Sequence, residues 1–211
     1  MSAEDHQHRP GGTRSDVASW EERYSAAPAL WSGQVNPSLV EQVSGLHPGR
    51  ALDVGCGEGG DVLWLAGRGW QVSGLDWSAV ALARAAEHAA AAGLTDRVQW
   101  IQGDIDTWLP PAGAYDLVTA HFLHPTAAQR LPLLDRLATS VAPDGTLLWV
   151  GHPYAAEPAA LWGADRFVAA DQLAADLDPQ LWDVQVAGQR PRTGGAEGHH
   201  HADEILQARR R

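Results

Sequence analysis

The chain has 211 residues, of which 45% are hydrophobic and 19% charged, enough for one domain with a sizeable core. Its 15 Lys and Arg against 26 Asp and Glu give a net charge of −11, which repels phosphate backbones and argues against nucleic acid as a partner. The chain has a single cysteine, Cys56, no signal-peptide core and no apolar run near the roughly 20 residues that cross a bilayer, so we expect a cytoplasmic protein with no membrane partner.

The amino-terminal quarter divides into two parts. Residues 1–16 mix His, Gly, Arg and acidic residues without any period, so we expect a disordered tail. Residues 17–48 have a helical pattern interrupted near Pro28 and Pro37. We expect these residues to be the first part of a single domain that runs over 17–211.

After residue 48, short apolar runs alternate with segments of helical periodicity. The runs predict strands at 50–55, 71–76, 98–102, 115–121 and 146–151, and the periodic segments predict helices at 61–68, 78–92 and 132–141. Residues 153–180 read as largely helical, and 181–189 and 204–208 as a late hairpin. The alternation predicts an α/β sandwich, Rossmann-like and doubly wound, with a mostly parallel seven-stranded sheet and an antiparallel edge strand.

The first predicted strand runs into a glycine-rich turn, DVGCGEGG at residues 53–60. Glycines let the chain turn sharply and let a ligand approach the bare backbone, but such a turn is a weak signal by itself. Asp76 ends the second strand, 21 residues beyond Gly55. A carboxylate there can accept both hydroxyls of a ribose, so the two features together predict a nucleoside site.

Two ligand classes fit a nucleoside site of this kind. The glycines of GCGEGG satisfy the dinucleotide fingerprint literally, so an NAD-dependent oxidoreductase is one alternative. Asp53 and Glu58 favour a cationic ligand over a pyrophosphate, and Asp104, after the third strand, is placed to accept from an adenine amino group. Adenosine with a positively charged tail is the better fit.

Taken in order, the segments DVGCGEGG, GLDWS, GDID, YDLVTAHFLH and APDGTLLW resemble the motifs of class I S-adenosylmethionine-dependent methyltransferases. The resemblance covers about residues 20–211, and within that superfamily the chain is similar to bacterial tellurite-resistance and thiopurine methyltransferase-like enzymes. It implies a methyltransferase domain at 17–211, in which residues 17–48 form a helical cover over the cofactor pocket. A non-catalytic module that binds an adenosyl ligand is a further alternative.

The reaction implied is an in-line transfer of a methyl group from S-adenosylmethionine, which leaves S-adenosylhomocysteine. The acceptor implied is a small molecule with a thiol, chalcogen, oxygen or nitrogen nucleophile, and the chain is expected to be a monomer or a homodimer. The Asn/Asp-Pro-Pro-Tyr turn of amino-methyltransferases is absent, since residues 120–125 read AHFLHP. Methylation of nucleobases or protein amides is therefore not expected.

The resemblance also assigns residues to the cofactor. Asp53 would organise the methionine ammonium group, Asp76 the ribose hydroxyls, and Asp104 the adenine amino group, with Trp77 against the adenine ring. The complete implied set is Tyr24, Trp31, Asp53, Gly55, Cys56, Gly57, Asp76, Trp77, Asp104, Ile105 and His121.

A general base is required only when the acceptor arrives protonated. His121, His124 and His152 are the candidates, because an imidazole pKa near 6.5 suits proton transfer at neutral pH. Histidines at 121 and 124 do not have the spacing of a tight metal-ligand motif, so we expect no metal.

Overall fold

A computed structural model of the chain describes residues 17–153, 166–192 and 202–211, so the tail expected at 1–16 lies outside the described residues. The strands are β1 (Arg50–Val54), β2 (Gln71–Asp76), β3 (Val98–Gln102), β4 (Tyr115–His121), β5 (Val141–Gly151), β6 (Trp182–Pro191) and β7 (Ala202–Arg210). The helices are α1 (Val17–Ala26), α2 (Pro37–Val43), α3 (Gly60–Gly67), α4 (Ala79–Ala91), α5 (Ala127–Ser140) and α7 (Ala170–Ala175), with a 3-10 turn at Thr95–Arg97.

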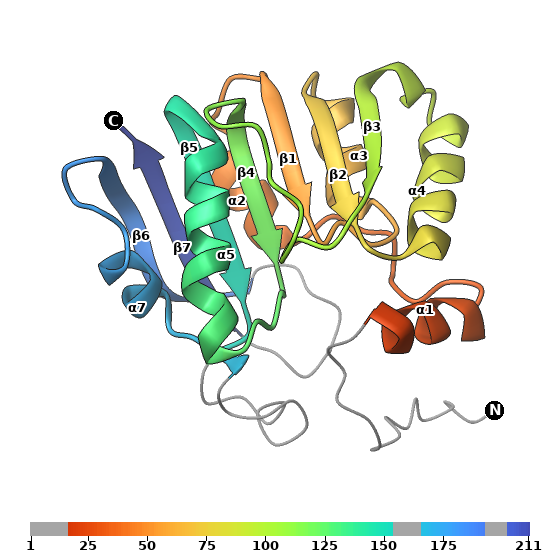
Figure 1. Cartoon of the computed structure of the whole chain (residues 1–211). Coiled ribbons are helices and arrows are strands. Elements are labelled where there is room, and N and C mark those ends of the chain that lie inside the picture. The colour runs from red at the N-terminus through yellow and green to blue at the C-terminus, as the bar shows by residue number, and fades with distance from the viewer. Residues whose placement is uncertain (1–16, 154–165, 193–201) are drawn as a thin grey trace.

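The strands form one seven-stranded sheet in the order β3-β2-β1-β4-β5-β7-β6 (Figure 1). Strands β1 to β5 pair in parallel, and β7 is antiparallel to both of its neighbours. This confirms the predicted Rossmann-like, mostly parallel sheet. The antiparallel strand lies one place in from the edge, and β6 takes the outer position. The reason is burial, since β7 is almost wholly buried and β6 mostly exposed.

Helices cover both faces of the sheet and form two cores. Helices α5 and α7 pack on one face through residues such as Leu137 and Leu173. Helices α2 and α3 pack on the other through Leu39 and Val62. Successive strand residues point to opposite faces, so a parallel strand buried on both sides has a continuous apolar run.

Helix boundaries agree with the prediction in one place and differ in another. Ser78 caps α4 as predicted, with its Oγ accepting from the backbone N–H of Ala81 at 3.1 Å. Helix α5 begins at Ala127, so the predicted start at Pro132 is wrong. Thr126 and Gln129 form a capping box that starts the helix earlier, and Pro132 lies inside it.

Two further features complete the described chain. Of the segment predicted as helical at 153–180, residues 170–175 form α7 and residues 154–165 lie outside the described part. Among the described helices, none has the length and apolar content needed to span a membrane.

The carboxyl ends of β1, β2 and β4 meet at one edge of the sheet, beyond which α1 lies (Figure 1). This edge is the place to look for a site.

Close packing inside the sheet makes one glycine of β2 sensitive to substitution. A Cβ at Gly74 would lie 2.8 Å from Trp100 Cζ3 and 3.0 Å from Cys56 Sγ. We expect Gly74→Ala to lower the free energy of unfolding by about 1–3 kcal/mol through overpacking. Gly67, at the end of α3, has nothing within 4 Å of a Cβ. Gly67→Ala should therefore be neutral or stabilise by up to about 1 kcal/mol. Equal losses for both variants in urea denaturation would contradict this packing.

Candidate active site

The turn between β1 and α3 leaves its backbone open to close approach. Gly55 and Gly57 have positive φ angles of 73° and 52°, which side-chain-bearing residues rarely adopt. A Cβ at Gly55 would lie 2.5 Å from Leu123 Cδ2, and one at Gly57 would lie 3.0 Å from the hydroxyl of Tyr24. The positive φ angles therefore favour glycine at both positions, and at Gly57 a Cβ would also crowd Tyr24.

Asp76, at the end of β2, fastens this turn to the start of the next helix. Its Oδ2 accepts the backbone N–H of Gly57 and its Oδ1 that of Ser78, both at 2.9 Å. Burial raises the pKa of this carboxyl, and the two backbone donors oppose the rise. A carboxylate has about four acceptor positions, so Asp76 can hold the turn and still accept from ligand hydroxyls.

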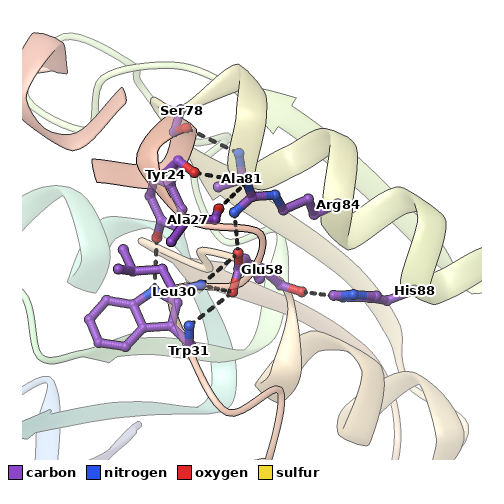
Figure 2. A network of polar contacts seen from close by, with 9 residues as sticks. All are labelled: Tyr24, Ala27, Leu30, Trp31, Glu58, Ser78, Ala81, Arg84 and His88. Carbon is purple, nitrogen blue, oxygen red and sulfur yellow. Dashed lines mark hydrogen bonds and ion pairs between the residues drawn. The ribbon is translucent and has the colours of Figure 1, made fainter. Parts of the chain in front are cut away.

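Glu58, in the same turn, anchors the segment that follows α1 (Figure 2). Its carboxylate accepts the backbone N–H groups of Leu30 and Trp31 and the Nη1 of Arg84 at 2.7 Å. Burial would raise the pKa of Glu58, but the Arg84 guanidinium and these N–H groups outweigh it and lower the pKa. The Glu58 carboxylate thus has its hydrogen-bond partners within the protein. A cationic ligand would have to be bound by other acidic residues.

The segment at 24–31 is held by Arg84 of α4 and by a hydrogen bond between two of its own side chains (Figure 2). Arg84 Nη2 donates to the backbone carbonyls of Tyr24 and Ala27 at 2.8 and 2.6 Å. Trp31 Nε1 donates to the Tyr24 hydroxyl at 2.9 Å. Tyr24 is buried beside Gly57, whereas Trp31 is half exposed. The structure thus brings Tyr24, Trp31 and the turn together at the carboxyl edge.

A second group of polar side chains lies at the ends of β1 and β4. Asp53 accepts from the Thr119 hydroxyl at 2.7 Å, and His121 Nδ1 lies 2.5 Å from Asp61 Oδ2. Ligand atoms of Asp53, Asp61 and His121 are within 4.8 Å of one another. A cationic ligand group close to this point would be attracted by the two carboxylates.

The pKa values of Asp53 and His121 are both raised, but the effect of burial differs between them. Burial, with the nearby Asp61 carboxylate, raises the pKa of Asp53 to about 7. Burial would lower the pKa of His121, but the carboxylates of Asp61 and Asp53 outweigh it and raise the pKa. Asp61 is the member that the sequence did not single out, because an acidic residue in the first turn of a helix is ordinary.

The other two candidate histidines pack in an aromatic cluster. The rings of His124 and His152 stack with centroids 5.2 Å apart, Phe167 lies 5.3 Å from His124, and Phe122 lies 4.6 Å from His152. Burial, with a neighbouring arginine, lowers the pKa of His124 to about 4. His124 is therefore neutral at pH 7, in surroundings unlike those of His121.

The remaining predicted residues lie around the ends of β2 and β3. Asp104 accepts the backbone N–H of Asp106 at 2.9 Å in the turn after β3, and Ile105 packs against the core beneath α5. Trp77 is half-buried beside the end of β2. Cys56 is buried in the opposite core, where burial raises the pKa of its thiol, so the side chain packs against protein and only its backbone lies in the turn.

Comparison with known proteins shows what this arrangement is similar to. A family described as "Methyltransferase domain" matches residues 51–145. Thiocyanate methyltransferase 1 of Arabidopsis thaliana is 31% identical over 143 residues, 65% of this chain and 63% of that protein. Ribosomal RNA small subunit methyltransferase C of Alcanivorax borkumensis is 36% identical over 107 residues, 49% of this chain and 32% of that protein. This chain thus spans less than two thirds of the length of either relative.

Solved structures share the fold at low sequence identity. One, titled "Conversion of a Disulfide Bond into a Thioacetal Group during Echinomycin Biosynthesis", has a TM-score of 0.72 and 21% identity, and covers 92% of both chains. The N-methyltransferase NodS of Bradyrhizobium japonicum, in complex with S-adenosylhomocysteine, has a TM-score of 0.66 and 18% identity, and covers 92% of this chain and 98% of its own. These similarities extend the shared fold well beyond residues 51–145.

The raised pKa of Asp53 gives stability a defined pH dependence. The folded chain holds this proton up to about pH 7, against an ordinary pKa of 3.8, so the Asp53 contribution to stability falls as the pH rises between these values and is constant above them. Asp53→Asn keeps an acceptor for Thr119, and we expect it to raise the free energy of unfolding by about 2–4 kcal/mol at pH 8 and to change it little at pH 4.

Chemical denaturation at both pH values measures this difference. Asp144→Asn is the matched control, since Asp144 forms an exposed ion pair with Arg209 and its loss should matter little at either pH. A gain for Asp53→Asn that is the same at both pH values would show that Asp53 is not protonated in the folded chain.

Proposed function

The chain belongs to the class I S-adenosylmethionine-dependent methyltransferases, and from this premise we propose that it transfers a methyl group from S-adenosylmethionine to a small-molecule acceptor. The observation that supports it most is the arrangement at the carboxyl edge of the sheet. Asp76 and the glycine turn lie at the end of β2. The buried carboxylate of Asp53 lies at the end of β1, with the partly buried Asp61 of α3 close to it. This order suits a ribose at one end and a cationic tail at the other.

The residues present fit that cofactor. Asp76 would accept the ribose hydroxyls, and Asp53 would bind the ammonium group. The bare backbone at Gly55 would let the methionine portion approach. Leu123 reaches this position only with the end of its side chain, which can rotate away. Asp104, Ile105 and Trp77 would surround the adenine.

When bound, S-adenosylmethionine supplies a methyl group already activated by a positive sulfonium. What the chain must add is alignment and exclusion of water, and alignment can be worth about 7–11 kcal/mol of the barrier. Tyr24 and Trp31, held over the turn by the contacts of Arg84 and Glu58, would exclude water from the cofactor. His121, at the end of β4, would face the acceptor and take its proton where it carries one.

A small-molecule acceptor is supported by charge and by several relatives. The net charge of −11 opposes binding to a polyanion. Relatives include methyltransferases named for thiocyanate and for trans-aconitate, and one named for 2-heptyl-1-hydroxyquinolin-4(1H)-one. One relative is named for ribosomal RNA, which makes RNA the competing acceptor to be tested.

The function is tested by acceptor-dependent release of S-adenosylhomocysteine. The purified chain is incubated with S-adenosylmethionine and, separately, with thiocyanate, trans-aconitate, an alkyl thiol, a phenol or 16S ribosomal RNA. We expect at least one small molecule to raise the rate well above the background and RNA not to do so. Release that is stimulated by RNA alone, or by no acceptor, would contradict the proposal.

Replacing Asp76 tests the cofactor site without an acceptor. Asp76→Ala removes the partner of the ribose hydroxyls and frees the turn, so we expect the affinity for S-adenosylhomocysteine to fall by about 1–3 kcal/mol, measured by quenching of tryptophan fluorescence. Asp116→Ala is the matched control, because Asp116 also accepts a backbone N–H, that of Arg50 at 2.7 Å, but at the opposite edge of the sheet. Unchanged affinity in Asp76→Ala would remove Asp76 from the site.

A further inference from the structure

We propose that Asp61 is a positioning residue for the methyl-transfer reaction, and that it holds His121 in the tautomer whose Nε2 accepts the proton of the acceptor. The proposal rests on the proposed function above, and it adds a residue that the sequence motifs do not single out. It assigns this role to Asp61 only for acceptors that carry a proton on the nucleophilic atom.

The carboxylate of Asp61 is fixed from two sides. Its Oδ2 lies 2.5 Å from His121 Nδ1, and its Oδ1 accepts the backbone N–H of Asn36 at 2.7 Å. Each oxygen has its own partner, so the carboxylate cannot turn without losing one of them. The imidazole is therefore held at Nδ1 by a group that is itself held.

The Asn36 donor is in turn part of a rigid corner. Asn36 caps α2, and its side-chain oxygen accepts the backbone N–H of Ser38 at 2.9 Å. The Ser38 hydroxyl donates to Asp203 Oδ2 of β7 at 2.7 Å, inside the protein. The anchor of Asp61 is thus tied through α2 to the buried strand β7.

The other nitrogen of His121 is left for a ligand. The side chain is 7% exposed, and its Nε2 is buried without a hydrogen-bond partner among the described residues. A buried polar atom without a partner costs about 1–3 kcal/mol, so an orphaned nitrogen at the carboxyl end of β4 indicates a position that an incoming polar group completes.

The partner on Nδ1 determines which nitrogen is basic. A carboxylate only accepts hydrogen bonds, so neutral His121 must keep its proton on Nδ1, where it donates to Asp61. The lone pair is then on Nε2. Asp53 of β1 and Asp203 of β7 also lie close enough to favour the charged form of the ring, so the imidazolium produced by proton transfer is stabilised by three carboxylates.

The proton and electron balance of the step is simple. The acceptor gives its proton to Nε2 of His121, and the lone pair left on the acceptor forms the new bond to the methyl carbon. The carbon–sulfur bond breaks and its electrons stay on sulfur. Asp61 remains a carboxylate throughout and acts only by orienting and stabilising the ring.

The tautomer is measured directly by nitrogen NMR of the full chain with ¹⁵N-labelled histidine, and the His121 signals are assigned by their loss in His121→Gln. We expect neutral wild-type His121 to carry its proton on Nδ1. In Asp61→Asn the new amide donates to Nδ1, so the proton should move to Nε2 and the pKa of His121 should fall. Asp116→Asn, at the far edge of the sheet, should change neither.

Two results of this measurement overturn the proposal. One is a wild-type His121 with its proton on Nε2, which requires no variant and therefore does not depend on whether Asp61→Asn folds. The other is a folded Asp61→Asn in which the tautomer and the pKa are those of the wild type. Neither result depends on methyl transfer, so the proposal on Asp61 can fail while the proposed function stands.

Kinetics then test the role of the tautomer in turnover. For a phenol, which must lose a proton, the wild-type rate should rise with pH as His121 becomes neutral, and Asp61→Asn should lower kcat by about 10²-fold or more. For thiocyanate, an anion without a proton, the same variant should lower kcat less than threefold. Equal losses with both acceptors would overturn the role in proton transfer. No release by the wild type with any acceptor would count against the proposed function instead.

Discussion

Three carboxylates, those of the buried Asp53 and Asp76 and of the partly buried Asp61, lie at the carboxyl edge of the parallel strands, and the surrounding structure is arranged to satisfy them. Burying a carboxylate is costly unless it is hydrogen-bonded or paired. Asp76 is satisfied by backbone N–H groups of the glycine turn and of α4, and Asp53 by a hydroxyl of β4. Asp61 is satisfied by the start of α2 and by His121. Each partner comes from a different element, so these bonds fix the elements around the site.

The same carboxylates give the site its chemical preference. Burial raises the pKa of Asp53, and the nearby carboxylates of Asp61 and Asp76 raise it further, so their mutual repulsion is not fully relieved within the protein. A ligand with a positive charge at this point relieves that repulsion, whereas a pyrophosphate increases it. The repulsion between these carboxylates lowers the stability of the folded chain at the proposed binding site, and functional sites commonly show such a loss.

The sequence predicted most of the fold because the signals were local. Apolar runs and helical periods located the core strands and α4, and the glycine turn with Asp76 indicated the carboxyl edge where we propose that the cofactor binds. Other features depend on partners distant along the chain. Glu58 forms an ion pair with Arg84, 26 residues away, and Asp61 contacts His121, 60 residues away. No local sequence pattern predicts either pair. The early start of α5 does have a local signal, the capping box formed by Thr126 and Gln129.

The claim at the centre of this account is that the carboxyl edge binds an adenosyl ligand with a cationic tail. Calorimetric titration of the purified chain with S-adenosylhomocysteine and, in parallel, with NAD and NADH tests it most directly. We expect micromolar binding of S-adenosylhomocysteine and no binding of either dinucleotide. Binding of NAD or NADH without binding of S-adenosylhomocysteine would contradict the account and indicate hydride transfer instead.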